Sequence, residues 1–180
     1  MFKRLFHTKR RGARSLALLL LALDTAACQA CRTPPPAQLI SPDEQLQQAT
    51  DIALAQVTDA RRIGATTHGI QIVEYRFRTL EQLAGTRSET FTLQGWVREG
   101  EDKDTTFNDH TDAAFWARGG GRTMNDMDCV IHPSFAVGAS YLVFLGSPAT
   151  WRSYEKIDMR GGAIKPGDKW FTYVKGWLGK

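Results

Sequence analysis

The sequence lacks a recognisable catalytic motif. Ser140 stands in the stretch Gly-Ala-Ser-Tyr-Leu, which has no closing glycine and so fails the pattern of a nucleophile elbow. The glycines of 119–122 follow no expected strand and open no expected helix, which predicts a loop and not a phosphate-binding cradle. The sequence therefore assigns a catalytic role to no residue.

The apolar run near the start is too short to cross a bilayer, which needs about twenty apolar residues. It covers the nine residues Ser15–Leu23 and is closed by Asp24. The first fourteen residues carry six Lys or Arg and no acid, a pattern typical of a secretory signal peptide. We predict a signal peptide over residues 1–30 and one exported domain over residues 31–180, periplasmic or secreted.

The exported part also lacks an excess of either charge. Residues 1–30 hold six of the 23 basic residues and one of the 19 acidic residues, which leaves 17 and 18. A net charge near zero gives no reason to expect nucleic acid or an anionic membrane as a partner.

Only three cysteines are present, and in an oxidising compartment they favour a disulfide over a metal site. Cleavage after Ala30 would remove Cys28 with the leader. The alternative is that Cys28 ends a lipobox, becomes a lipidated N-terminus and anchors the protein to a membrane. Thr25, in place of the usual Leu, favours the first route. On either route Cys31 and Cys129 remain as the predicted disulfide pair.

Local signals predict several elements. Ser41, Pro42 and Glu44 predict a helix start with a capping box, in a short helix that ends near residue 50. We expect a strand over 53–63, although its apolar residues fit neither the helical nor the strand period cleanly. The segment 168–178 fits a last strand or a helix, and both remain open.

Alternation of apolar and polar residues predicts a hairpin and a later strand. Apolar and polar residues alternate over 69–85, which predicts a long antiparallel strand with one solvent-exposed face. A second strand over 88–97 follows after a turn at Gly85. A bulge or bend is expected at Gly95. The segment 135–146 predicts a further strand, entered from a turn at Gly138. Short strands with glycine turns and few helices indicate a small β barrel or sandwich.

The long polar segment 98–128 suggests a weak metal site. Its oxygen ligands suit calcium and its histidine suits zinc. These residues are Asp102, Asp104, Asp109, His110 and Asp112. The segment fails the EF-hand template, and composition favours a solvated loop whose Asp and Asn side chains cap turns. We therefore expect no cofactor, with calcium as the one alternative. A metal-binding envelope hydrolase that uses Asp109, His110 and Asp112 is the alternative function.

His132 and several aromatic residues are better explained by structure than by function. His132 precedes a proline, which predicts a turn residue. Base stacking on the aromatic residues is less favoured than core packing, because no basic groove accompanies them. The aromatic residues concerned are Trp96, Trp151, Tyr154, Trp170 and Trp177.

Three landmarks occur in a recognisable order: a cysteine followed by prolines, the stretch YRFRTLEQLAG, and the stretch DCVIHPSFAVGASYLVFLG. Together they resemble the netrin-like module, the OB-type β barrel of tissue inhibitors of metalloproteinases and of exported bacterial relatives. The resemblance covers about residues 31–146 and leaves 147–180 as a C-terminal extension. It implies a mainly β fold: a small five-stranded antiparallel barrel with a short flanking N-terminal helix, here with a long acidic loop.

The resemblance also implies a function. In the inhibitors the amine and carbonyl of the N-terminal cysteine chelate the zinc of the target enzyme. That role would fall on Cys31, with Arg32, Thr33 and Pro34 entering the cleft. We therefore expect an exported, non-enzymatic domain that binds another, unidentified protein, with protease inhibition as a special case. A lipidated envelope protein with a structural role is a further alternative.

Overall fold

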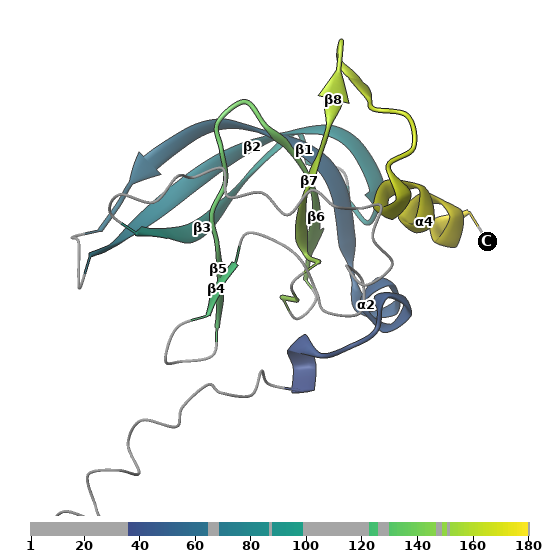
Figure 1. The fold of residues 1–180 in the computed structure, drawn as a ribbon, viewed down its shortest axis with the longest axis horizontal. Helices are drawn as coiled ribbons and strands as arrows, with labels where there is room; N and C mark the ends of the chain where they lie inside the picture. Colours follow the sequence, from purple (N-terminus) through teal and green to yellow (C-terminus); the bar gives the residue numbers. More distant parts are fainter. Residues whose placement is uncertain are drawn as a thin grey trace, which may run out of the picture.

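The computed structural model of the protein describes residues 36–64, 69–86, 88–98, 123–125, 130–146, 149–150 and 152–179 (Figure 1). The elements in chain order are η1 (Pro36–Gln38), α2 (Pro42–Gln48), β1 (Asp51–Arg62), β2 (Ile70–Ala84), β3 (Thr90–Arg98), β4 (Thr123–Asn125), β5 (Ile131–Pro133), β6 (Ser140–Leu145), β7 (Tyr154–Ile157), β8 (Met159–Arg160), β9 (Ala163–Ile164) and α4 (Lys169–Leu178).

A five-stranded antiparallel sheet organises the fold, in the order β3-β2-β1-β6-β7. The expectation of a mainly β domain with a short N-terminal helix is confirmed, as are the predicted strands 53–63 and 69–85 and the hairpin of β2 with β3. Two small two-stranded sheets, β4-β5 and β8-β9, complete the strands. In the part of the chain that the structure describes, no ladder joins β3 to β7, so the sheet keeps two edges and is not closed into a barrel.

The connection order is that of a Greek key. Strands β1, β2 and β3 follow one another as neighbours, and β6 then returns to pair with the free side of β1. A Greek key is defined by three consecutive strands and a fourth that lies beside the first. This topology sets β1 at the centre of the sheet (Figure 1).

Strand β1 is buried on both faces, which explains its ambiguous sequence pattern. Its ladder with β2 contains three register shifts, between residues 52 and 53, 54 and 55, and 57 and 59. Such bulges bend a strand and increase its twist. By the ordinary alternation of a strand, Ile52 and Leu54 pack on one side of the sheet, while Ala55 and Val57 pack on the other.

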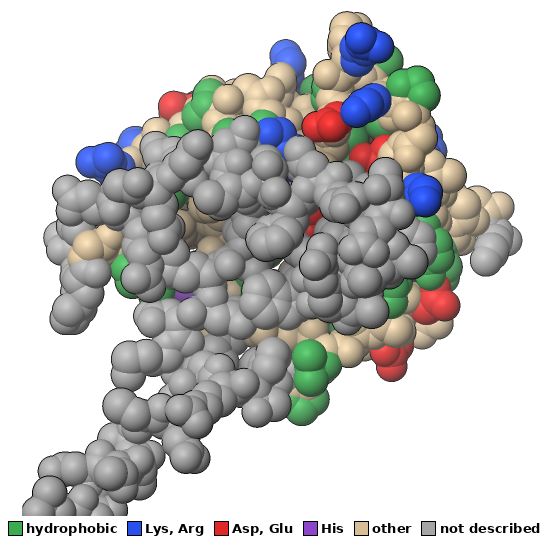
Figure 2. All heavy atoms as spheres, viewed as in Figure 1, with side chains coloured by type: hydrophobic (Ala, Val, Ile, Leu, Met, Phe, Trp, Pro, Cys, Tyr) green, Lys and Arg blue, Asp and Glu red, His purple; other side chains and the backbone are tan. Residues whose placement is uncertain are grey.

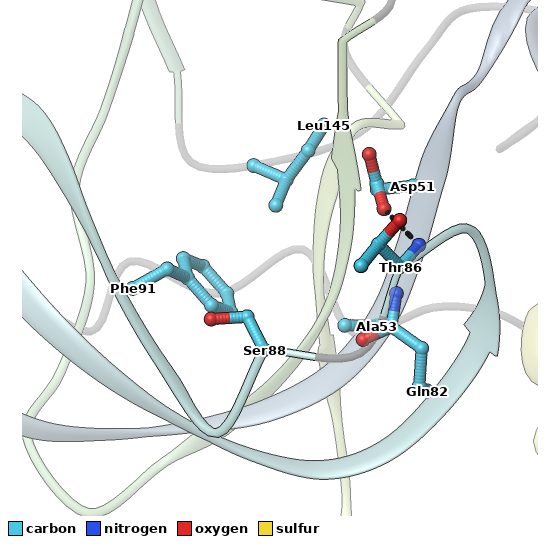
Figure 3. Close-up of a pocket in the computed structure, with 7 residues that line it drawn as sticks. All are labelled: Asp51, Ala53, Gln82, Thr86, Ser88, Phe91 and Leu145. Carbon is cyan, nitrogen blue, oxygen red and sulfur yellow. Dashed lines mark hydrogen bonds between the residues drawn. The ribbon is translucent and has the colours of Figure 1, made fainter.

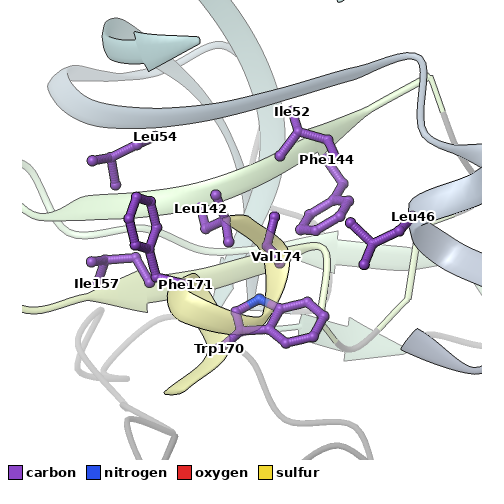
Figure 4. Close-up of a cluster of buried hydrophobic side chains, with 9 residues drawn as sticks. All are labelled: Leu46, Ile52, Leu54, Leu142, Phe144, Ile157, Trp170, Phe171 and Val174. Atoms are coloured by element: carbon purple, nitrogen blue, oxygen red, sulfur yellow. The ribbon is translucent and has the colours of Figure 1, made fainter. Parts of the chain in front are cut away.

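The two helices cover one side of the sheet, where the first hydrophobic cluster lies (Figure 4). Its buried members are Leu46, Ile52, Leu54, Leu142, Phe144, Ile157, Trp170, Phe171 and Val174. The segment 168–178, which the sequence left open, is helix α4. Asp168 caps it by accepting a hydrogen bond from the Phe171 backbone nitrogen at 2.8 Å. Trp170, Phe171 and Val174 recur at one-turn spacing, so the helix presents one apolar stripe to the sheet.

The second hydrophobic cluster occupies the opposite side of the sheet. It is formed by Ala55, Val57, Val73, Tyr75, Phe77, Val97, Phe135, Tyr141 and Val143. Phe135 comes from the irregular segment between β5 and β6 and is fully buried. Its ring meets those of Tyr75, Phe77 and Tyr141 edge to face, at centroid distances of 5.0, 5.0 and 4.9 Å.

The structure confirms helix α2 and corrects the expectation at Gly95. The capping box of Ser41 and Glu44 is formed. The helix ends at Gln48, close to the expected residue 50, and β1 begins at residue 51. The β2-β3 register runs without a shift past Gly95, so the expected bulge is wrong. A Cβ at residue 95 would lie 1.7 Å from the Pro133 carbonyl oxygen, and this close approach explains the glycine.

His132 lies in β5 and not in a turn. Its imidazole ring stacks on the indole of Trp96, with centroids 3.5 Å apart and planes 4° apart. Since β5 and β3 are distant in the sequence, this contact has no local signature. The stack joins the small β4-β5 sheet to the edge of the main sheet.

Charges of both signs are interspersed on the described surface, as the coloured upper rim of Figure 2 shows. Exposed pairs include Arg61 with Glu74 at 2.9 Å and Lys175 with Glu81 at 2.6 Å. Such solvent-exposed pairs contribute little to stability. None of the described helices is both long and apolar enough to cross a membrane.

Candidate functional site

The site residues predicted from the sequence lie outside the described residues. This holds for Cys28, Cys31, Arg32, Thr33, Pro34 and Cys129, and for Asp102, Asp104, Asp109, His110 and Asp112. Their disulfide, partner-binding, lipidation and metal roles therefore stay predictions. Among the residues that the structure does describe, no group of three or more His, Cys, Asp or Glu could hold a metal ion.

A buried polar network links α2 to the segment before β7. The Gln45 side-chain oxygen accepts hydrogen bonds from the Thr150 hydroxyl at 3.0 Å and from Arg152 Nε at 3.3 Å. The Gln45 amide nitrogen donates to the Ser153 hydroxyl at 3.1 Å. All four residues are almost fully buried. Since buried polar groups are costly unless they are hydrogen-bonded, this network specifies one docking position for α2.

Arg152 extends the network to the chain just before α2. Its guanidinium donates to the backbone carbonyl of Ile40. Burial lowers the pKa of Arg152, and the neighbouring charge of Glu155 opposes that effect. Gln38, in η1, is also largely buried. The segment that follows Pro36 is thus tied to the sheet and not merely tethered to α2.

A first hollow lies beside the turn between β2 and β3, and we call it the turn hollow (Figure 3). Its volume is about 270 Å³, and it is lined by Asp51, Ala53, Gln82, Thr86, Ser88, Phe91 and Leu145. The Asp51 carboxylate accepts hydrogen bonds from the Thr86 backbone nitrogen at 2.8 Å and from the Thr50 hydroxyl at 3.2 Å. Gly85, at φ +81°, lies so close that a Cβ there would be 2.1 Å from the same carboxylate.

The carboxylate of the turn hollow therefore serves the fold. Both of its oxygens accept internal hydrogen bonds, and they hold the β2-β3 turn against the start of β1. Ala53, Phe91 and Leu145 add apolar side chains to the lining. The Ser88 hydroxyl donates a hydrogen bond to the Thr90 carbonyl at 2.7 Å. The turn hollow therefore leaves few polar groups to which a ligand could form hydrogen bonds.

A second hollow lies between α2 and α4, and we call it the interhelix hollow. Its volume is about 370 Å³, and it is lined by Asp43, Thr172, Tyr173, Gly176 and Trp177. The Tyr173 hydroxyl donates a hydrogen bond to Asp43 Oδ1. Burial, followed by the hydrogen bond and the negative charge of Asp43, raises the pKa of Tyr173 to about 12. The tyrosine consequently stays a neutral donor at physiological pH.

The interhelix hollow is the stronger candidate site, because it combines a carboxylate with two aromatic rings. Sequence reasoning missed it. In the sequence Asp43 is only an acidic residue near the start of a short helix, and Trp177, for which core packing is expected, does pack against the first hydrophobic cluster. The two residues of the Asp43–Tyr173 hydrogen bond are 130 positions apart, so no local pattern could join them. The one available signal was Gly176, a glycine inside an amphipathic helix.

Comparisons with known proteins return no match, whether the chain is compared with protein-family models, with curated proteins or with solved structures. The class of protein is defined by its own fold, a mainly β domain with a five-stranded antiparallel sheet and two flanking helices.

Proposed function

We propose that this chain is an exported, non-enzymatic binding domain of netrin-like, OB-type architecture, whose N-terminal segment binds a protein partner in the cell envelope or outside the cell. Inhibition of a zinc protease is the sharpest form of this function. The observation that carries the proposal is the Greek-key order of the five-stranded sheet.

The OB fold is a five-stranded, partly open Greek-key barrel. The strand order β3-β2-β1-β6-β7 is compatible with such a barrel opened between its two edge strands. The three register shifts of the β1-β2 ladder favour the strong curvature that a barrel requires, because bulges are what bend sheets toward closure. In this proposal the gap between β3 and β7 is the open seam.

The anchored segment before α2 supports the role of the N-terminus. If export processing ends at Ala30, only five residues precede Pro36. A chain of five residues spans at most about 18 Å when fully extended. The amine of Cys31 would then stay near an element that Arg152 ties to the sheet. Anchoring of this kind lowers the entropy lost on binding.

The test begins with the exported protein. Its intact mass before and after reduction should show a chain that begins at Cys31 and gains two hydrogen atoms on reduction of the bridge to Cys129. That protein is then assayed against zinc endopeptidases, beside a variant with one alanine inserted before Cys31. The insertion moves the free amine away from the position that chelation requires.

Inhibition by the natural N-terminus that is lost in the extended variant would support the proposal. An acyl group on Cys28 would contradict the chelating mechanism, since no free amine would remain. A hydrolytic activity of the protein itself, removed by a chelator and by His110→Ala, would support the alternative enzyme instead.

A further inference from the structure

We propose that the interhelix hollow binds an organic ammonium ion, with its charge against Asp43 and its alkyl groups against the rings of Tyr173 and Trp177. This inference goes beyond the proposed function, because none of these residues belongs to the N-terminal segment 31–34. It rests on the lining of the hollow, on the hydrogen bonding of Asp43 and on a glycine that the fold does not require.

The Asp43 carboxylate can accept a further hydrogen bond. Within the described part of the chain only its Oδ1 accepts a hydrogen bond, from the Tyr173 hydroxyl. Oδ2 is thus available to a ligand, in contrast to the Asp51 carboxylate of the turn hollow, both oxygens of which are used. The Asp43 side chain is also exposed, so a ligand reaches it without rearrangement.

Tyr173 and Trp177 supply an aromatic wall. They stand four residues apart on α4, and residues at this spacing are neighbours on one helix face. The Tyr173 ring is supported from behind by Trp170, stacked at a centroid distance of 5.7 Å with planes 14° apart. Trp170 is itself fully buried, which fixes the position of this wall. Aromatic rings attract cations through their negative faces, and quaternary ammonium ligands use this interaction.

Gly176 lines the hollow without adding a side chain to it. It lies in the last turn of α4, where glycine is less favourable than alanine. A Cβ at this position would meet no atom of the described residues within 4 Å, and its φ is not positive. Neither packing nor backbone geometry explains the glycine, whereas an alanine would add a methyl group to the lining of the hollow.

Of the described residues that line the hollow, Asp43 alone is charged. Lys175, beside Gly176, donates to Glu81 at 2.6 Å and lies 5.4 Å above the Phe171 ring, so its ammonium is engaged elsewhere. The Arg152 guanidinium, which lies near Tyr173, is bonded to Gln45 and to the Ile40 carbonyl, and the negative charge of Glu155 partly offsets its positive charge. The volume of about 370 Å³ is at the lower end of ligand pockets, roughly 300–1,000 Å³, which suits a small ligand.

The test is a titration of the exported protein with choline, followed by the indole N–H resonance of Trp177 in NMR spectra. The matched neutral ligand is 3,3-dimethylbutan-1-ol, which has the shape of choline without its charge. Choline is expected to bind at least about fivefold more tightly than the alcohol, given the strength of cation–π and ion-pair contacts. A parallel titration with a lysine amide distinguishes a quaternary from a primary ammonium as the natural source.

Three variants in the hollow, and one control outside it, separate binding from folding. Asp43→Asn should weaken choline binding about fivefold or more, while Asp158→Asn, the same charge change at an exposed carboxylate outside the hollow, should leave it unchanged. Gly176→Ala should raise the melting temperature, because alanine favours helix, and yet weaken binding. Trp177→Ala should abolish the response to choline by ligand-detected NMR.

The proposal is overturned by any one of three results. These are no binding of choline or of the lysine amide, equal binding of choline and the neutral alcohol, or equal affinities in Asp43→Asn and Asp158→Asn. A Gly176→Ala protein that is more stable and binds as tightly as the natural chain would contradict the role assigned to the glycine. Because that variant is expected to fold better than the natural protein, misfolding cannot account for its loss of binding.

Discussion

The two sides of the five-stranded sheet are covered in different ways. On one side α4 lays an apolar stripe, and α2 the single side chain of Leu46, against the cluster that contains Leu142 and Phe144 (Figure 4). On the other side no described helix covers the cluster, and Phe135, from an irregular segment, fills its centre among four aromatic rings. One side of the sheet is therefore stabilised by the apolar stripe of a helix, whereas the other is stabilised by the packing of the single ring of Phe135.

Of the substitutions predicted here, Phe135→Ala should lower the free energy of unfolding most. The ring is fully buried and meets the rings of Tyr75, Phe77, Tyr141 and Tyr154. Its removal leaves a cavity, which costs about 3–5 kcal/mol of the free energy of unfolding. Urea unfolding measures this loss.

The matched control is Val137→Ala, two residues away and 59% exposed. It should change the free energy of unfolding by no more than about 0.5 kcal/mol. A loss below about 1 kcal/mol for Phe135→Ala would mean that the cluster closes over the gap, and that one ring does not determine this side.

Gly95→Ala tests how β5 meets β3 at the edge of the main sheet. The added methyl would collide with the Pro133 carbonyl oxygen, which must then move. We expect a loss of about 1–3 kcal/mol, the usual range for overpacking. The Trp96–His132 stack should loosen as well, and the indole N–H resonance of Trp96 in NMR spectra reports on it. Thr92→Ala, at an exposed position of β3, is the control and should be nearly neutral.

Asp168→Ala tests the helix-covered side with a smaller expected effect. The change removes the N-cap of α4, whose side chain accepts from the Phe171 nitrogen at 2.8 Å. Loss of such a cap costs about 1 kcal/mol. Asp168→Asn keeps an acceptor and should retain most of that stability. Thermal unfolding measures both, and equal melting temperatures for the two variants would show that the cap is not used.

The pH dependence of Tyr173 is the smallest effect and also belongs to the helix-covered side. Its pKa is raised from 10.0 to about 12, so the folded state holds the proton more tightly than the unfolded state. The resulting stabilisation is complete below about pH 10 and is lost as the pH rises toward about 12. Near-ultraviolet titration of the natural protein and of Tyr173→Phe should identify this late-titrating tyrosine.

Asp43→Asn provides the complementary measurement. It removes the negative charge that contributes to the raised pKa, so Tyr173 should titrate at a lower pH than in the natural protein. An unchanged titration would mean that burial and the hydrogen bond, and not the charge of Asp43, raise the pKa of Tyr173. The same variant then serves both this prediction and the ligand titration.

Elements with local signals were predictable from the sequence. The capping box of Ser41 and Glu44 places the start of α2, and the alternation along β2 identifies a strand with one wet face. Strand β1 was harder, because a strand buried on both faces loses its alternation. The segment of α4 fitted a strand or a helix, because its aromatic residues suit both and only packing against the sheet selects one.

Contacts between distant residues were not predictable. The approach of Pro133 to Gly95, the stack of His132 on Trp96 and the bond of Tyr173 to Asp43 each join segments with no shared pattern. The interhelix hollow exists only because α4 returns to α2 after the whole sheet has been built.

The sequence by itself determined the start of α2 and the exposed face of β2, because caps and hydrophobic periodicity act over a few residues. Only the tertiary structure decided the Greek-key order, the two-sided burial of β1 and the meeting of Asp43 with Tyr173 and Trp177. The physical reason is that strand pairing and side-chain packing join residues far apart in the chain, and their energies depend on the assembled neighbours.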